Sequence, residues 1–88
     1  MMINQVLLKG VVTEIEDGYF EMQLEDGNKD KIFIYDVADY TISNLLLNNK
    51  VAVRGHLKIS NNGLLNVICD SVIILDGRGR KWYIKSTN

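Results

Sequence analysis

Residues 39–60 read DYTISNLLLNNKVAVRGHLKIS, and this stretch decides the fold. Its first half places Ile42, Leu45 and Leu46 at the i, i+3, i+4 spacing of an amphipathic helix, which predicts a helix over residues 39–49. Its second half, KVAVRGHLKIS, is apolar and β-branched, which predicts a strand. A single helix therefore stands directly before a long strand.

Short apolar runs rich in Val, Ile and Leu, with no proline anywhere, predict strands on both sides of this helix. The five predicted strands are INQVLLKGVVTEIE (3–16), YFEMQLE (19–25), KIFIYDV (31–37), KVAVRGHLKIS (50–60) and LLNVICDSVIIL (64–75). Turn residues separate them, DGNKD between the second and third and SNNG between the fourth and fifth.

Three strands, one helix and two strands is the order of the OB-fold, a five-stranded Greek-key barrel with one short helix between strands three and four. Gly10 and Gly55 lie inside the first and fourth strands, which suits strands that bend to close a barrel. An SH3-like barrel is the nearest competitor, but it lacks a helix at this place. We expect an all-β protein with this fold, forming one domain over residues 1–88.

The stretch GRGRKWYIK (77–85) holds four of the ten Lys and Arg residues. DGRGR has turn composition and KWYIK alternates like a strand, which predicts a sixth strand over residues 81–85 beside SVIIL (71–75). A free tail is the alternative. Alternation divides this strand into a wet, basic face and an apolar face that seals the barrel or a subunit interface. Lys81, Tyr83 and Lys85 form the wet, basic face, and Trp82 and Ile84 form the apolar face.

Charge is unevenly distributed along the chain. Residues 1–76 carry six basic and eleven acidic side chains, whereas residues 77–88 carry four basic and none acidic, for a net charge of −1. This excludes a uniformly basic surface for duplex DNA, but it permits a local positive strip. Carboxylates that would repel phosphate cluster around the second strand, namely Glu14, Glu16, Asp17, Glu21, Glu25 and Asp26.

The sequence offers little for catalysis or for metal binding. No nucleophile–base pair and no phosphate-cradling glycine loop is visible, so we expect no enzyme and no cofactor. His56 is the only histidine, which predicts a surface histidine rather than a metal ligand. Cys69 is the only cysteine, which excludes an intramolecular disulfide and fits a buried thiol in a cytoplasmic protein. Polar residues interrupt the first apolar run, so we expect neither a signal peptide nor a membrane span.

Several segments resemble the bacterial and phage single-stranded-DNA-binding proteins and the related primosomal replication proteins. MINQVLLKGVVTE (2–14) resembles the first strand of that family, KVAVRGHLKI (50–59) its fourth strand and DSVIILDG (70–77) the end of its fifth. ADYTISNLLLNNKVAVRG resembles its helix-to-strand junction, with Ala38, Asp39 and Leu45 in register. The connections DGNKD and SNNG are shorter than in the family, and the basic segment replaces its acidic tail tip, which puts tail-mediated recruitment in doubt.

The resemblance implies an OB-fold that coats single-stranded DNA, or RNA, in replication, recombination or repair, working as a homodimer or homotetramer. Such binding needs phosphate contacts and aromatic faces for base stacking. The candidate nucleic-acid-binding residues are Lys9, Tyr19, Phe33, Tyr35, Arg54, Lys58, Arg78, Arg80, Lys81, Tyr83 and Lys85. The alternative is an adaptor of the primosomal kind, or a phage assembly factor, with exposed aromatics that dock a protein partner; the acidic body and short loops favour it.

Alternation refines the expectation for individual aromatic residues. Phe20 shares its face with Met22 and Leu24, so Tyr19 should point outward. Phe33, Tyr35 and Val37 share one face of the third strand, opposite Ile32 and Ile34. Either at least one of Phe33 and Tyr35 stacks on bases, or one of them is in the core and the other at the surface. Two more aromatic residues are expected to have structural roles. Tyr40 should pack near the start of the helix, and Trp82 should anchor the last strand.

Overall fold

The computed structural model describes residues 4–26 and 28–75, and residues 81–84 through their backbone. The strands are β1 (Gln5–Glu16), β2 (Tyr19–Leu24), β3 (Lys31–Tyr35), β4 (Lys50–Ile59), β5 (Leu65–Ile74) and β6 (Lys81–Ile84), with α1 (Asp39–Ile42) between β3 and β4. The five strands predicted from alternation are therefore present, in the predicted order.

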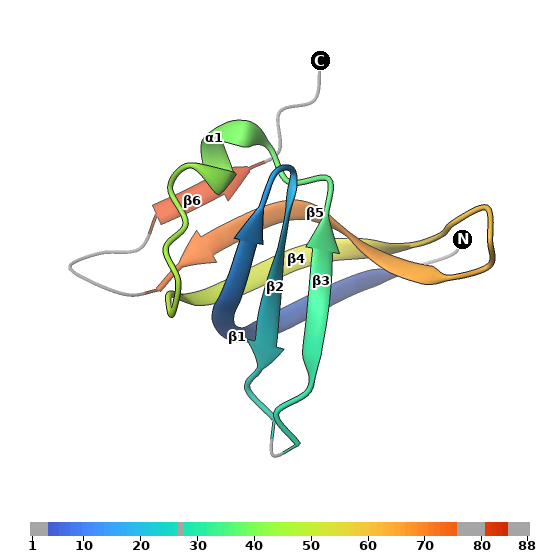
Figure 1. Cartoon of the computed structure of the whole chain (residues 1–88), viewed down its shortest axis with the longest axis horizontal. Helices are drawn as coiled ribbons and strands as arrows, with labels where there is room; N and C mark the ends of the chain where they lie inside the picture. Colours follow the sequence, from blue (N-terminus) through green and yellow to red (C-terminus); the bar gives the residue numbers. More distant parts are fainter. Residues whose placement is uncertain (1–3, 27, 76–80, 85–88) are drawn as a thin grey trace.

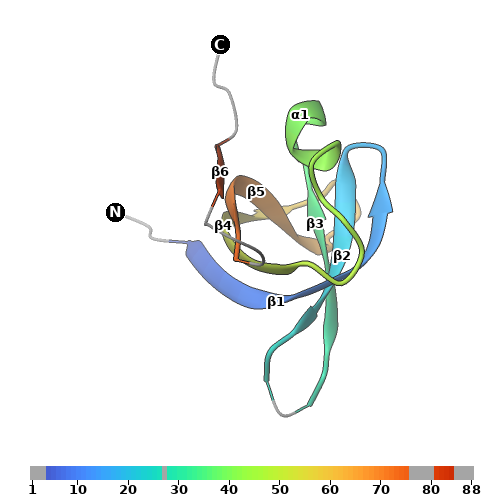
Figure 2. The same cartoon turned by 90° about the vertical axis from the view of Figure 1, so that its left-hand side faces the viewer.

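The strands form one sheet in the order β3-β2-β1-β4-β5-β6, and a further parallel pairing of β3 with β5 closes it into a five-stranded barrel. β1 is long enough to pair with β4 over its first half and with β2 over its second. Figures 1 and 2 show β1 curving around the barrel between these two partners. The fold is an OB-fold, as the order of elements predicts.

Two glycines allow neighbouring strands to approach closely. A Cβ atom at Gly10 would clash with the carbonyl oxygen of Gln23 in β2, and one at Gly55 with the carbonyl oxygen of Ile68 in β5. Any larger residue would force these strands apart. The prediction that both glycines serve the curvature of the barrel is consistent with this crowding.

Two β-bulges reset the alternation of the long strands. Val12 and Ile15 are three positions apart, so in a regular strand they would point to opposite faces. The first bulge, at Thr13, lets both of them point towards the core. The second, at Asp70 in β5, lies opposite the Arg54–Gly55 step of β4. Bulges bend and twist a strand, and here they keep apolar side chains inside while the strands curve.

The core is filled by the inward side chains of the barrel strands and by residues of the β3–β4 connection. All of these are apolar and buried: Val12, Phe20, Met22, Ile34, Val37, Leu45, Val51, Val53, Val67, Cys69, Val72 and Ile74. Cys69, the only cysteine of the sequence, is a buried thiol, as predicted.

The helix is much shorter than residues 39–49, the range that the apolar spacing predicts. α1 is a single turn, Asp39–Ile42, and only Leu45 beyond it enters the core. Asn48 adopts a left-handed φ of 72° and its N–H donates to the Val12 carbonyl oxygen at 2.8 Å. The chain is thus held against β1 before a second helical turn can form.

A sixth strand pairs with the end of β5, as the alternation of KWYIK predicts. Lys81–Ile84 runs antiparallel to Ser71–Ile74, with Tyr83 opposite Val72. Residues 76–80, for which a turn is predicted, Lys85 and the side chains of residues 81–84 lie outside the described part of the chain. The predicted wet and apolar faces of this strand, with Trp82 as an anchor, therefore stay predictions.

Candidate nucleic-acid interface

Three aromatic rings lie together on the outer face of β2 and β3. The ring centroids are 5.9 Å apart for Tyr19 and Phe33, 5.6 Å for Tyr19 and Tyr35, and 6.2 Å for Phe33 and Tyr35. These separations fall in the range of favourable aromatic contacts, so the rings support one another. We call Tyr19, Phe33 and Tyr35 the aromatic face. Phe33 is its most open member, with 38% of its surface exposed.

Phe33 and Tyr35 share one face of β3, as alternation predicts, and the alternative in which they divide between core and surface is wrong. They are the two neighbours of the buried Ile34 in β3, and because successive side chains of a strand alternate between its faces, both point outward. The outward position of Tyr19, in contrast, is confirmed. Alternation ends at Asp36, whose left-handed φ of 59° turns Val37 into the core, where it packs on the opposite side from the rings.

Tyr40, which we expect to pack near the start of the helix, lies in the single turn of α1 and is 44% exposed, so more than half of its surface is covered. It lies outside the aromatic face.

Carboxylates border the aromatic face on the β1 side. Glu21 is the cross-strand partner of Phe33 and of Glu14, and Glu16 is the partner of Tyr19. The Thr13 hydroxyl donates to Glu21 Oε1 at 2.8 Å, which fixes one of these carboxylates in place. Phosphate groups would be repelled on this side.

The opposite border, where β3 closes on β5, has a different character. A hollow with a volume of about 240 Å³ lies there, which we call the closure hollow. It is lined by Lys31, Ile32, Phe33, Tyr35, Leu65, Asn66 and Val67. Two rings of the aromatic face thus share a depression with one ammonium group and one side-chain amide, and none of its described lining residues carries a carboxylate.

Lys58 lies just beyond the closure hollow. Parallel pairing places Tyr35 beside Ile68, and Asn66 of the same β5 face is the cross-strand partner of Lys58 in β4. Lys58 is exposed and lies on the outer face of β4. The closure hollow is therefore flanked by Lys31 on β3 and by Lys58 on β4, which a strand passing over the rings could contact together.

Lys9 and Arg54, also candidates from the sequence, lie elsewhere on the barrel. Both are exposed on the outer side of the β1–β4 pair, where Leu7 is the partner of Arg54 and Ala52 the partner of Lys9. We call this surface the β1–β4 face. Arg54 and Lys58 do share the outer side of β4, as their spacing predicts, because the bulge near Gly55 falls on β5. The structure does not bring Lys9 or Arg54 to the aromatic face.

His56 lies between Arg54 and Lys58 and forms an ion-pair contact with Asp70. Its Nδ1 atom is 3.1 Å from each carboxylate oxygen, and both side chains are partly exposed. The bulge at Asp70 brings this carboxylate beside the histidine. His56 is a surface histidine, as predicted, and Asp70 is engaged by it.

The remaining candidates fall outside the described side chains. These are Arg78, Arg80, Lys81, Tyr83 and Lys85, all from the basic segment at the end of the chain. Their part in binding stays a prediction.

Sequence reasoning missed Lys31 and Asn66. Lys31 has the same parity as Phe33 and Tyr35 in KIFIY, and this signal could have identified it. No local signal exists for Asn66, because its position depends on the pairing of β3 with β5 across 30 or so residues of chain.

A scan against protein-family models and a search of curated proteins find no match to this sequence. In the part of the chain that the structure describes, no helix is long and apolar enough to cross a membrane. What can be inferred about function therefore comes from the barrel and from the side chains on its surface.

Proposed function

We propose that this protein binds single-stranded nucleic acid, DNA or RNA, without reading its sequence. Bases stack on the aromatic face while Lys31 and Lys58 contact phosphates on either side of the closure hollow. The observation that carries the proposal is the cluster of three touching rings, Tyr19, Phe33 and Tyr35, on the outer face of β2 and β3. The strand-2 and strand-3 face of this fold is a surface on which oligonucleotides are bound.

Exposed rings on an outer sheet face offer what unpaired bases require. Every base has a π-face, and stacking of one base on an aromatic side chain contributes about 1–3 kcal/mol. Phe33 presents the most open ring, and the two tyrosines are half-buried beside it. Such contacts tolerate any sequence, so the proposed role is coating and protection of single strands in replication, recombination or repair.

Charge selects the path of the strand across these rings. Glu14, Glu16 and Glu21 exclude phosphates from the β1 side, whereas no carboxylate is among the described residues that line the closure hollow, and Lys31 and Lys58 flank it. The backbone should therefore cross from β3 over the closure hollow towards β4. A duplex cannot follow this path with its bases against the rings, since its bases are already stacked and paired.

One barrel offers few phosphate contacts, so a single site should be weak. Assembly into a homodimer or homotetramer would place several aromatic faces along one strand, and the resulting avidity would compensate for this weakness. Oligomerisation belongs to the proposal for that reason.

A fluorescence-anisotropy titration of the protein into labelled oligo-dT, at low and at moderate salt, tests this function. We expect saturable binding that weakens as salt rises, because phosphate contacts release counterions. A labelled duplex of the same length should bind far less tightly. Absence of binding to oligo-dT at tens of micromolar protein would contradict the proposal.

A further inference from the structure

The first half of β1 has one side without a partner strand. β1 pairs with β4 from Gln5 onward, but its pairing with β2 begins only at Gly10. Between these points, no strand in the described part of the chain covers the second side of β1. An open strand edge therefore runs over residues 5–8 of this barrel.

Hydrogen bonds at its two ends show which backbone groups face this open edge. The Leu57 N–H donates to the Asn4 carbonyl oxygen at 3.2 Å, so Asn4 faces β4, whereas the Glu25 N–H donates to the Lys9 carbonyl oxygen at 2.9 Å, so Lys9 faces away from it. Alternate residues of an antiparallel ladder direct their N–H and C=O groups to the same side. Gln5 and Leu7 therefore direct theirs into the open edge, as Lys9 does.

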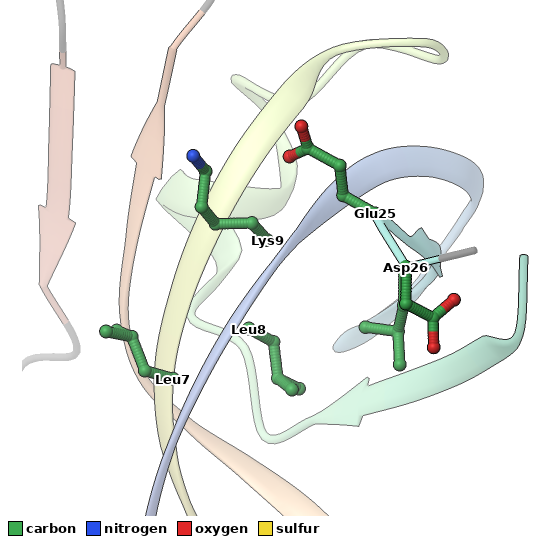
Figure 3. A pocket seen from close by; sticks show the side chains of 6 residues that line it. Leu7, Leu8, Lys9, Glu25 and Asp26 are labelled. Carbon is green, nitrogen blue, oxygen red and sulfur yellow. The ribbon is translucent and has the colours of Figure 1, made fainter. Parts of the chain in front are cut away.

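The side chains along the edge are apolar and incompletely covered. Leu7 points outward and is 74% exposed, the largest exposed fraction among the big apolar side chains of the described residues. Val6 and Leu8 point inward but are only partly buried, although they pack against the core. Figure 3 shows Leu7 and Leu8 leaving opposite sides of β1. An added strand would cover all of them at once.

A hollow with a volume of about 480 Å³ lies at the end of this edge, where β2 ends beside β1. It is lined by Leu7, Leu8, Lys9, Leu24, Glu25 and Asp26, of which five are labelled in Figure 3. Its apolar lining accepts a side chain from an added strand. Its two carboxylates outnumber its single ammonium group, so a basic side chain is favoured there.

We propose that this edge binds an extended peptide segment of a protein partner, a segment that alternates apolar and basic residues. The peptide adds as a strand beside Gln5–Leu8, and its main chain pairs with Gln5 and Leu7. Its apolar side chains cover Val6 and Leu8, and a lysine or arginine lies near Glu25 and Asp26. This peptide site is separate from the aromatic face and does not depend on the proposed nucleic-acid binding.

Charge favours this occupant over two others. Nucleic acid would bring phosphates to Glu25 and Asp26, which repel them. A second copy of the chain could pair its own β1 antiparallel to this edge. That arrangement would place the second copy's Lys9 towards the Gln5 end, away from the two carboxylates, and would leave them unmatched.

Hydrogen exchange detected by NMR, with the peptide Ac-KVKVKVKV-NH₂ as probe, tests the proposal. In the free protein the Leu7 amide should exchange rapidly, as an unpaired group does, and saturating peptide should slow it at least tenfold. The matched peptide Ac-EVEVEVEV-NH₂ should leave it unchanged. The amide of Phe33, on the aromatic face, should respond to neither peptide.

A charge variant separates strand addition from non-specific attraction. The double variant E25Q/D26N should bind the lysine peptide roughly three- to tenfold more weakly at low salt, as the loss of two exposed charge pairs predicts. The E14Q/E16Q double variant, which removes the same charge elsewhere, should bind normally. Asn at position 26 can still accept the loop hydrogen bonds that Asp26 Oδ1 receives from the Asn28 and Lys29 N–H groups.

Three results would overturn the proposal. Unchanged exchange of the Leu7 amide with saturating lysine peptide would exclude strand addition at this edge. If both double variants bound the lysine peptide equally weakly, its attraction would depend only on the net charge of the protein and not on Glu25 and Asp26. Protection of the Leu7 amide in the free protein that grows with protein concentration would show that a second copy occupies the edge instead. If E25Q/D26N fails to fold, the comparison of the two peptides still decides.

Discussion

The aromatic face and the β1–β4 face are built on opposite principles. β2 and β3 carry three rings in contact, bordered on the β1 side by carboxylates. The β1–β4 face carries exposed Lys9 and Arg54 but no aromatic side chain. One surface can stack bases and repels phosphates along one border; the other attracts phosphates but carries no Phe, Tyr or Trp ring for stacking.

The difference shows where the two requirements of single-strand binding come together. Lys58 belongs to β4, yet its partner Asn66 lines the same hollow as Phe33 and Tyr35. In the described part of the chain, Lys31 and the rings of Phe33 and Tyr35 share the outer face of β3, and the closure of β3 on β5 brings Asn66, with Lys58 beside it, to the same hollow. The candidate site therefore depends both on the composition of β3 and on the closure of the barrel.

The largest effect is expected from removing the most open ring. Phe33→Ala should weaken oligo-dT binding by about 1–3 kcal/mol, or roughly five- to 150-fold, because one stacked base is lost. Fluorescence anisotropy measures this loss. Tyr40→Ala is the matched control, since Tyr40 is similarly exposed but lies off the aromatic face. Equal losses in the two variants, with unchanged thermal stability, would mean that the aromatic face has no special part in binding.

A smaller effect is expected at the cations beside the closure hollow. Lys31→Ala and Lys58→Ala should each reduce the slope of log affinity against log salt by about 0.7, the contribution of one phosphate contact on a single strand. Affinities measured at four or more salt concentrations give this slope. A slope that stays at its original value in both variants would place the phosphates elsewhere.

Removing the carboxylate opposite Phe33 should strengthen binding modestly. Glu21→Gln is expected to raise the affinity for oligo-dT about two- to threefold at low salt, since an exposed like-charge interaction is of this size. The glutamine oxygen can still accept from the Thr13 hydroxyl, so the local structure should persist. Glu25→Gln, distant from the aromatic face, serves as control. A decrease in affinity for Glu21→Gln would show that this side chain contacts the nucleic acid directly.

The smallest effect is expected on the β1–β4 face. Arg54→Ala and Lys9→Ala should change the affinity for oligo-dT by less than about twofold, the range of an exposed charge that makes no specific contact. Arg54 and Lys58 share one side of β4, so this pair is a sensitive comparison. If Arg54→Ala weakens binding as much as Lys58→Ala, the nucleic acid extends over both faces and the division between them is lost.

Much of the barrel could be predicted from alternation, and the misses have local causes. The five strands and the outward position of Tyr19 follow from the two-residue period of inward and outward side chains. The period could not foresee the left-handed residues Asp36 and Asn48, which turn Val37 into the core and stop the helix after one turn. The helix propensity of residues 43–47 favours a longer helix, but the backbone hydrogen bonds that Asn48 and Asn49 form with β1 end it early.

The site could be predicted only in part, because it depends on long-range pairing. Tyr19, Phe33 and Tyr35 were candidates from residue type, and the structure places them in one cluster. The separation of Lys9 and Arg54 from this cluster, and the approach of Asn66 to it, follow from which strands are neighbours. Strand neighbours in a closed barrel are set by the whole chain, so no local pattern in the sequence reveals them.

NMR chemical-shift mapping of the protein titrated with oligo-dT tests the central claim most directly. We expect the largest changes on the ring resonances of Tyr19, Phe33 and Tyr35 and on the side-chain amide of Asn66, with smaller changes at Lys31 and Lys58. The backbone amides of residues 5–8 should hardly move. Changes concentrated on the β1–β4 face, with the three rings unaffected, would contradict it.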